Sequence, residues 1–245
     1  MRTIRVFHGS PLKGKDRVTL DAGAAKHLLT VLRLKLGDEV TLFDGSGFEF
    51  AGTLDQADKK QAWVKIARMH GPVVESPLHV TLAQGVSRGE RMDYTVQKAV
   101  ELGVAAIQPV LTERSVVKLD RDGGEKKRLH WQSVAVSACE QSGRVKVPEV
   151  KAPVALPQFL GNKLAGDLKL LLDPDGGVTA GMLPQPADGR VLLRVGPEGG
   201  LSADEIALAG RVGFQGLKLG PRILRTETAA LVALSLLQAS WGDLD

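Results

Sequence analysis

The stretch that decides the fold is Gly196-Pro-Glu-Gly-Gly-Leu-Ser202, together with its counterpart Leu219-Gly-Pro-Arg-Ile-Leu-Arg-Thr-Glu-Thr-Ala229. Each segment follows a short apolar run, residues 191–195 in one case and 214–219 in the other, and each leads into a predicted helix. Ser202 and Glu205 fit a capping box, so the first helix begins directly after the glycines. Successive strand–loop–helix units predict an α/β sheet, in which ligands bind beyond the carboxyl ends of the strands.

The first loop predicts a ligand site, but not one for a nucleotide phosphate. Gly196, Gly199 and Gly200 allow a ligand to approach the backbone closely, and the helix N-terminus that follows favours anions. However, the chain contains neither Gly-x-x-x-x-Gly-Lys-Ser/Thr nor Gly-x-Gly-x-x-Gly. Glu198 would also repel a phosphate. These features favour a neutral or cationic ligand, and the alternative is a tight strand–helix connection that binds nothing.

A change of pattern near residue 71 divides the chain into two predicted domains. Residues 1–70 are predicted to be mostly β and suggest a small barrel, because several short strands occupy few residues. Residues 71–78, which contain Gly71, Pro72 and Pro77, are predicted to be a linker, and residues 79–245 form the second domain. The alternating runs of the first domain are residues 17–20, 39–43 and 63–67, with a hairpin turn at 44–47.

One helix is expected within the first domain, from Ala22 to Arg33. Asp21 suits its N-cap, and an apolar face is formed by Leu28, Leu29 and Leu32. The second domain alternates between predicted strands and helices, which favours a largely parallel sheet with helices on both faces. Its expected strands are residues 79–83, 105–111, 168–173 and the two apolar runs above, and its expected helices include 92–102 and 126–141.

Composition restricts the class of protein. The 245 residues are 43% hydrophobic and 24% charged, as in ordinary globular proteins, and no apolar stretch is long enough to span a membrane. Cys139 is the only cysteine, which excludes an internal disulfide and a cysteine-rich metal site and fits a reducing cytoplasm. We expect no export signal and no metal. The net charge of +4 is a weak indication of a polyanionic partner.

The last helix is apolar nearly all round from Ala229 to Leu237. A helix of this kind is buried, either in the core of its own domain or in a contact between subunits. A dimer whose interface adjoins the two loops is therefore expected.

The two quoted segments closely resemble the signature of the SPOUT class of methyltransferases, and within it the small-subunit ribosomal RNA methyltransferase E group. The resemblance extends along the chain to further motifs. These are His27-Leu-Leu-Thr-Val-Leu-Arg33, Gly37-Asp38, Phe43-Asp-Gly45, Gln97-Lys-Ala-Val-Glu-Leu-Gly103, Glu113-Arg-Ser115 and Cys139-Glu-Gln-Ser-Gly-Arg144.

The resemblance implies a fold and an activity that spacing alone does not. The first domain would be a PUA-like RNA-binding β-barrel, and the second would hold a deep trefoil knot, which is rare in proteins. The family is described as methylating N3 of uridine 1498 in 16S ribosomal RNA of the small subunit, with S-adenosylmethionine as methyl donor. It works as a homodimer, whose catalytic pocket is completed across the interface.

The same resemblance implies the site residues. Those expected to bind the cofactor are Leu171, Leu172, Gly196, Pro197, Glu198, Gly199, Gly200, Leu219, Gly220, Ile223, Leu224, Thr226, Glu227 and Thr228. The candidates for RNA contacts are Lys26, Arg33, Arg88, Arg91, Arg114, Arg144 and Arg222, and each also suits a solvated surface.

The reaction requires the proton on uracil N3 to leave before N3 can attack a methyl group. Arg225 and Arg114 are candidates to stabilise negative charge on the uracil oxygens. Glu198 or Glu227 would accept the proton, although for Glu227 the favoured interpretation is a carboxylate that stabilises a helix N-terminus. The residues leave the choice between Glu198 and Glu227 open.

Three rival functions remain at this point. One is methylation of a ribose 2′-hydroxyl or of another base position. Another is RNA binding without catalysis, and the third is an enzyme that holds a small anion in the glycine loops. The absence of a lysine in the first loop and the presence of Glu198 count against the third.

Overall fold

The computed structural model describes residues 4–58, 61–162 and 166–244. It divides the chain into two compact units, one of residues 1–75 with 139–147 and the other of residues 76–138 with 148–245. The boundary after residue 75 lies inside the predicted linker. Residues 139–147 belong with the first unit although they lie far along the chain, and no local pattern in the sequence indicated this.

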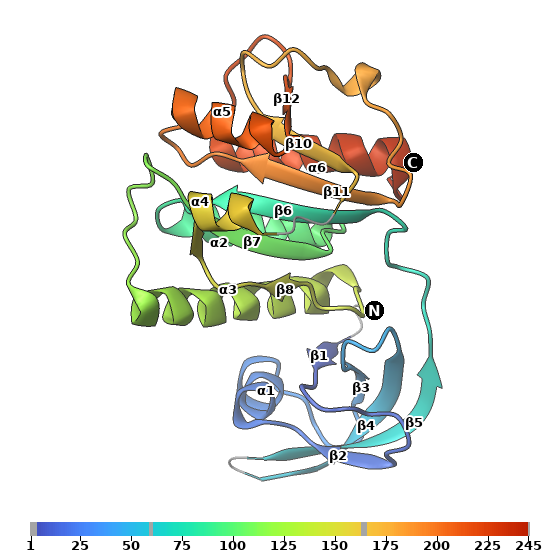
Figure 1. Cartoon of the computed structure of the whole chain (residues 1–245). Helices are drawn as coiled ribbons and strands as arrows, with labels where there is room; N and C mark the ends of the chain where they lie inside the picture. Colours follow the sequence, from blue (N-terminus) through green and yellow to red (C-terminus); the bar gives the residue numbers. More distant parts are fainter. Residues whose placement is uncertain (1–3, 59–60, 163–165, 245) are drawn as a thin grey trace. The chain divides into compact units, whose positions relative to one another are not determined.

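In the first unit, strands form a sheet in the order β1-β3-β4-β5-β2 (Figure 1). Their bounds are β1 Arg5–Phe7, β2 Arg17–Thr19, β3 Glu39–Phe43, β4 Glu49–Ala57 and β5 Ala62–His70. The pairing of β1 with β3 is parallel and the other pairings are antiparallel. The predicted hairpin is confirmed, because residues 44–47 join β3 to β4 with Phe43 opposite Glu49.

The prediction of an α-helix from Ala22 to Arg33 was wrong for the second half of this segment. Asp21 caps α1 (Ala22–Lys26) as predicted, with its carboxylate accepting from the Ala24 N–H at 2.8 Å. The chain then widens into a π-type turn, His27–Val31, in which the Leu32 N–H bonds to the His27 carbonyl at 3.0 Å.

The wider turn changes which leucines face the core. A π-type turn takes up more residues than an α-helical turn, so the apolar face moves round the axis. Leu28 is fully buried as expected, but Leu32 is 41% exposed, and Leu34 takes its place in the core. Arg33 adopts a φ of 57°, which ends the turn.

The second unit is an α/β sheet in the order β12-β10-β11-β6-β7-β8, with β9 also beside β7. All these pairings are parallel, which confirms the predicted sheet class. The strands are β6 His79–Gly85, β7 Ala106–Leu111, β8 Glu149–Val150, β9 Val154–Ala155, β10 Leu168–Leu172, β11 Arg190–Val195 and β12 Gln215–Leu217.

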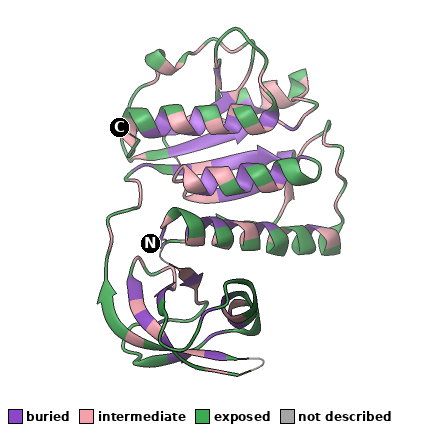
Figure 2. Ribbon diagram, turned by 180° about the vertical axis from the view of Figure 1, so that it is seen from behind, coloured by how far each residue is buried: buried purple, intermediate pink, exposed green. Residues whose placement is uncertain are grey.

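Helices cover both faces of this sheet. Helices α2 and α6 lie on one face, and α4 and α5 lie on the other (Figures 1 and 2). The bounds are α2 Glu90–Glu101, α3 Arg121–Ser142, α4 Leu156–Gly161, α5 Ala203–Arg211 and α6 Thr226–Trp241, with a 3₁₀ turn at Ala180–Met182. The strands between the helix layers are largely buried, as Figure 2 shows.

Burial follows from the sequence pattern of the strands. Leu171, Leu192 and Ala83 pack with Phe159 of α4 and Ala209 of α5 in one apolar cluster. Strands covered on both faces need apolar side chains at successive positions, which is why β10 and β11 consist of short apolar runs. The layers therefore hold the carboxyl ends of β10, β11 and β12 at one edge of the sheet.

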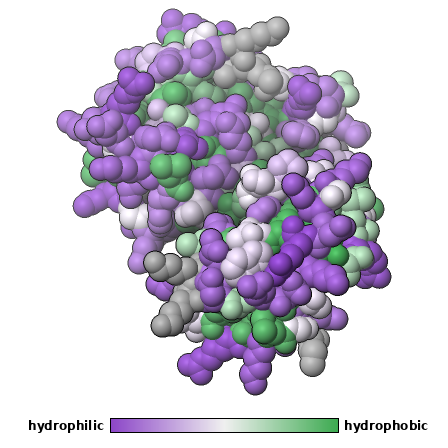
Figure 3. Space-filling model, turned by 90° about the horizontal axis from the view of Figure 1, so that it is seen from below, coloured by the Kyte–Doolittle hydropathy of each residue, from purple (hydrophilic) through white to green (hydrophobic). Residues whose placement is uncertain are grey.

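The surface of the molecule carries polar groups over most of the face seen in Figure 3, and hydrophobic side chains there lie in small separate groups. Within the described residues, no helix is both long and apolar enough to cross a membrane.

Candidate functional site

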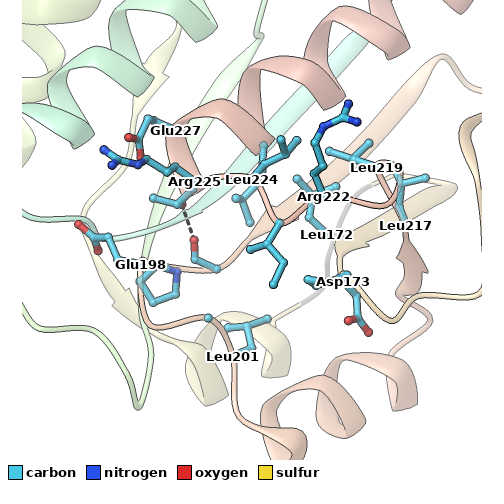
Figure 4. Close-up of a pocket in the computed structure, with 18 of the residues that line it drawn as sticks. Leu172, Asp173, Glu198, Leu201, Leu217, Leu219, Arg222, Leu224, Arg225 and Glu227 are labelled. Atoms are coloured by element: carbon cyan, nitrogen blue, oxygen red, sulfur yellow. Dashed lines mark hydrogen bonds between the residues drawn. The ribbon is translucent and has the colours of Figure 1, made fainter.

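A pocket of about 510 Å³ opens where the loops after β10, β11 and β12 meet the start of α6. Five leucine side chains contribute to the apolar part of its walls, and Figure 4 shows them around the hollow. These leucines are Leu172, Leu201, Leu217, Leu219 and Leu224. The volume lies within the range of pockets that bury a small organic ligand.

The loop after β11 forms one wall of the pocket with its backbone. The Gly200 N–H donates to the Pro197 carbonyl at 2.9 Å, which closes a tight turn. Gly200 has a φ of +69°, a conformation that residues with a Cβ rarely adopt. Ser202 and Glu205 then form the predicted capping box, so α5 begins immediately after the turn.

The start of α6 is tied to the same loop. The Thr226 hydroxyl donates to the Gly196 carbonyl at 2.5 Å and accepts from the Gln84 amide at 2.9 Å. Arg225 is the N-cap residue of α6, and its exposed side chain lines the pocket. The loop and the helix therefore meet through Thr226 beneath the pocket.

Two carboxylates lie on one side of the pocket, and Asp173 lies on the opposite side (Figure 4). Glu198 Oε2 and Glu227 Oε2 are both buried without a hydrogen-bond partner among the described residues. A buried carboxylate oxygen without a partner is costly unless a ligand or water satisfies it. This side of the pocket is therefore suited to a proton donor or a positive charge.

The environment of Glu198 is the more polar of the two. Its Oε1 accepts from the Arg88 backbone N–H at 3.0 Å and from Arg91 Nη1 at 3.2 Å. Burial alone would raise the pKa of Glu198, but the hydrogen bonds from Arg88 and Arg91 outweigh burial, so that its pKa lies below the ordinary value. Glu198 is thus held as a carboxylate and is a weak proton acceptor.

Comparison with known proteins places this geometry in a family. A model described as an RNA methyltransferase domain matches residues 74–238, and one described as an RNA methyltransferase PUA domain matches residues 20–67. A curated relative from Buchnera aphidicola subsp. Schizaphis graminum, ribosomal RNA small subunit methyltransferase E, is 33% identical over 99% of this chain and 98% of its own length. The chain belongs to the ribosomal RNA small subunit methyltransferase E family.

Solved structures agree with this assignment. A methyltransferase from Legionella pneumophila, solved with S-adenosylmethionine bound, superimposes with a TM-score of 0.95 at 44% identity, covering 100% of both chains. The methyltransferase E of Neisseria gonorrhoeae, also solved with S-adenosylmethionine, gives a TM-score of 0.92 at 38% identity, again over 100% of both chains. The described fold is thus that of small-subunit rRNA methyltransferases.

In this methyltransferase the structure brings most of the expected cofactor residues to one pocket. Those that line it are Leu172, Gly196, Pro197, Glu198, Gly200, Leu219, Gly220, Ile223, Leu224, Thr226 and Glu227. Three others lie outside its lining. Leu171 is buried in the apolar cluster between sheet and helices, Thr228 is exposed, and Gly199 faces Arg114.

The expected RNA-contact residues fall into different environments. Lys26, Arg33, Arg88, Arg91, Arg114 and Arg222 are exposed. Arg91 and Arg222 also line the pocket, and Arg114 Nη1 donates to the Gly199 carbonyl at 3.2 Å.

Arg144 is different, because its side chain is 8% exposed and its Nη2 lies 2.7 Å from Glu75 Oε2. The same carboxylate accepts from the Val145 and Lys146 N–H groups at 2.9 Å each. This network ties residues 144–146 to Glu75 within the first unit, and in this structure the Arg144 side chain faces that carboxylate and not the solvent.

Sequence reasoning missed several pocket residues. Asp173, Leu201, Ile206 and Leu217 line the pocket, but they come from three separate segments. The apolar run at 214–219 extends to Leu219, so the end of β12 at Leu217 was not visible in the sequence. Nothing local indicated that Ile206 of α5 would reach the same hollow.

Proposed function

We propose that this methyltransferase transfers a methyl group from S-adenosylmethionine to N3 of uridine 1498 in 16S ribosomal RNA of the small subunit. The observation that carries the proposal is the pocket itself, with its group of leucine side chains, its glycine backbone and two unpartnered carboxylate oxygens. The solved relatives that bind S-adenosylmethionine support the choice of donor.

The residues present fit that donor. S-adenosylmethionine has an apolar, planar adenine and a positively charged sulfur. The cluster of Leu172, Leu217 and Leu219 suits the adenine, and the loop at 196–200 offers backbone groups at close range. The unpartnered carboxylate oxygens of Glu198 and Glu227 would attract the positively charged sulfur.

Two finer features of the fold belong to the same proposal. The first unit would close into a PUA-like barrel, and the second would be threaded as a trefoil knot. The knot is proposed from the family resemblance, and the order β12-β10-β11 is compatible with it, although unknotted doubly wound sheets also place an earlier strand between two later ones.

When bound, S-adenosylmethionine supplies a methyl group on a positively charged sulfur. The chain's own task is to orient uracil N3 toward that group and to remove the N3 proton. Arg225 would stabilise the negative charge that develops on the uracil oxygens, because it lines the pocket and is exposed to an incoming base. Arg114 is the weaker candidate, since it lies outside the pocket lining and donates to Gly199.

Glu227 is the better proton acceptor of the two carboxylates. Glu198 has one oxygen held by Arg88 and Arg91, and those bonds lower its pKa. Glu227 lines the same pocket and has a buried oxygen with no partner among the described residues. These observations support Glu227 as the proposed proton acceptor.

Contacts to RNA are assigned to the exposed cations. Lys26 and Arg33 would contact it from the first unit, and Arg88, Arg91, Arg114 and Arg222 from the second. Contacts to phosphates are released by salt, so binding through these residues weakens as ionic strength rises.

A homodimer completes the proposal. Helix α6 buries Ala230, Ala233 and Leu234, yet Val232 and Leu236 on its other side are 37% and 39% exposed. This apolar side would be covered by a second copy. Sedimentation velocity at micromolar concentration is expected to give the mass of a dimer, and a monomer at that concentration would reject this part of the proposal.

Filling the pocket is expected to abolish donor binding. Leu224→Trp places a large ring in the hollow, so titration calorimetry should show at least a tenfold loss of affinity for S-adenosylmethionine. The matched control is Leu36→Trp, at a position in the first unit that is 64% exposed. Equal affinity in both variants would place the donor elsewhere.

A further inference from the structure

Gln84 is completely buried at the carboxyl end of β6, directly beside Val195 of β11. It does not line the pocket, and neither the sequence motifs nor the proposed chemistry uses it. Its amide nevertheless reaches Thr226, which joins the glycine loop to α6. Gln84 Nε2 donates to Thr226 Oγ1 at 2.9 Å, and that hydroxyl donates to the Gly196 carbonyl at 2.5 Å.

The direction of these bonds is fixed by the groups that take part. Gln84 Nε2 also lies 3.2 Å from the Gly85 carbonyl, which can only accept, so the NH₂ group must face this side. A threonine hydroxyl has a single proton. Because the hydroxyl of Thr226 accepts from Gln84, its proton is directed to Gly196. Such a chain of bonds strengthens each of its members.

A separate observation places the end of β6 against the same loop. A Cβ at Gly85 would lie 2.4 Å from the backbone nitrogen of Pro197 and 2.7 Å from the carbonyl carbon of Gly196. Only a glycine allows this approach. The backbone of β6 thus supports the loop from below at the residue next to Gln84.

We propose that Gln84 is a positioning residue, which through Thr226 holds the Gly196 carbonyl and so fixes the loop at 196–200 against the start of α6. Its effect on the loop does not depend on the ligand. Its effect on S-adenosylmethionine rests on the proposed function, because that loop is the wall against which the donor would lie.

The first test measures the loop in the free protein. Gln84→Met keeps the length of the side chain and Gln84→Leu nearly keeps its volume, and both remove the donor. Backbone hydrogen exchange at residues 198–201 is expected to become about tenfold faster in each variant. This is the change expected when local opening becomes easier by the free energy of one buried hydrogen bond. Exchange in the second half of α6 should stay at the wild-type rate.

The matched control is Gln108→Met. Gln108 is also a buried glutamine of the same sheet, and its Nε2 donates to the Pro109 and Ala152 carbonyls, away from the loop. Its replacement is expected to lower overall stability without a selective increase in the rate of hydrogen exchange at residues 198–201. Thr226→Val should loosen the loop as Gln84→Met does, and the double variant should be no looser than Thr226→Val, because both changes break one chain of bonds.

The second test is the affinity for S-adenosylmethionine by calorimetry, expected to fall about tenfold in Gln84→Met and to be unchanged in Gln108→Met. The inference would be overturned if both Gln84 variants kept the wild-type rate of hydrogen exchange at residues 198–201. It would also be overturned if Gln108→Met raised that rate as much as the Gln84 variants do. If the wild-type protein fails to bind the donor, the proposed function fails, while the exchange rates still decide the role of Gln84.

Discussion

Replacing Arg225 with alanine is expected to lower kcat for methyl transfer about 100- to 1,000-fold, which is the usual effect of removing a group that stabilises developing negative charge. The guanidinium forms no hydrogen bond or ion pair within the part of the chain that the structure describes, and it is exposed at the start of α6. Its loss should therefore change stability by less than about 0.5 kcal/mol. Single-turnover kinetics and thermal unfolding on the same sample measure the two effects.

Arg222→Ala is the matched control for this prediction. Arg222 is another exposed arginine of the same loop and pocket, but it is assigned to RNA binding. The Arg222→Ala change should weaken RNA binding and reduce the salt dependence of the RNA affinity. Its effect on kcat should be smaller than that of Arg225→Ala. An Arg225→Ala variant that keeps its full kcat would remove this side chain from the mechanism.

Replacing Glu227 with glutamine is expected to lower kcat about 100-fold or more, because an amide cannot take the proton from uracil N3. Affinity for S-adenosylmethionine should change much less than kcat. The difference in kcat between the variant and the wild type should become smaller as pH rises, since the solvent then removes the N3 proton without help from the enzyme. Rates of single turnover across a pH series measure this.

Glu198→Gln separates the two carboxylates. Glu198 is held by Arg88 and Arg91 and its pKa is already lowered, so its replacement should leave the pH profile of kcat in its wild-type form. If Glu198→Gln lowered kcat more than Glu227→Gln did, and if this effect became smaller at high pH, Glu198 would be the proton acceptor instead of Glu227.

Local patterns in the sequence were sufficient for most of the fold. The capping box at Ser202, the N-cap at Asp21 and the hairpin at residues 44–47 depend on neighbouring residues alone, and the structure confirms each. The apolar runs of β10 and β11 were predictable because both faces of these strands are covered.

Features that depend on distant residues were not predictable. The π-type turn after Lys26 exchanges Leu32 for Leu34 in the core, a choice that depends on packing and not on periodicity. Arg144 resembled a surface cation until the structure paired it with Glu75, which lies 69 residues earlier. Gln84 carried no motif, since its partner Thr226 lies 142 residues later.

The most direct test of the proposed activity is transfer of labelled methyl from S-adenosylmethionine to small ribosomal subunits that lack the modification, followed by nucleoside analysis of the 16S RNA. The account predicts a single labelled product, 3-methyluridine, from uridine 1498. A different methylated nucleoside would keep the fold and the donor but contradict the assigned target. RNA binding without any transfer would contradict catalysis by this chain.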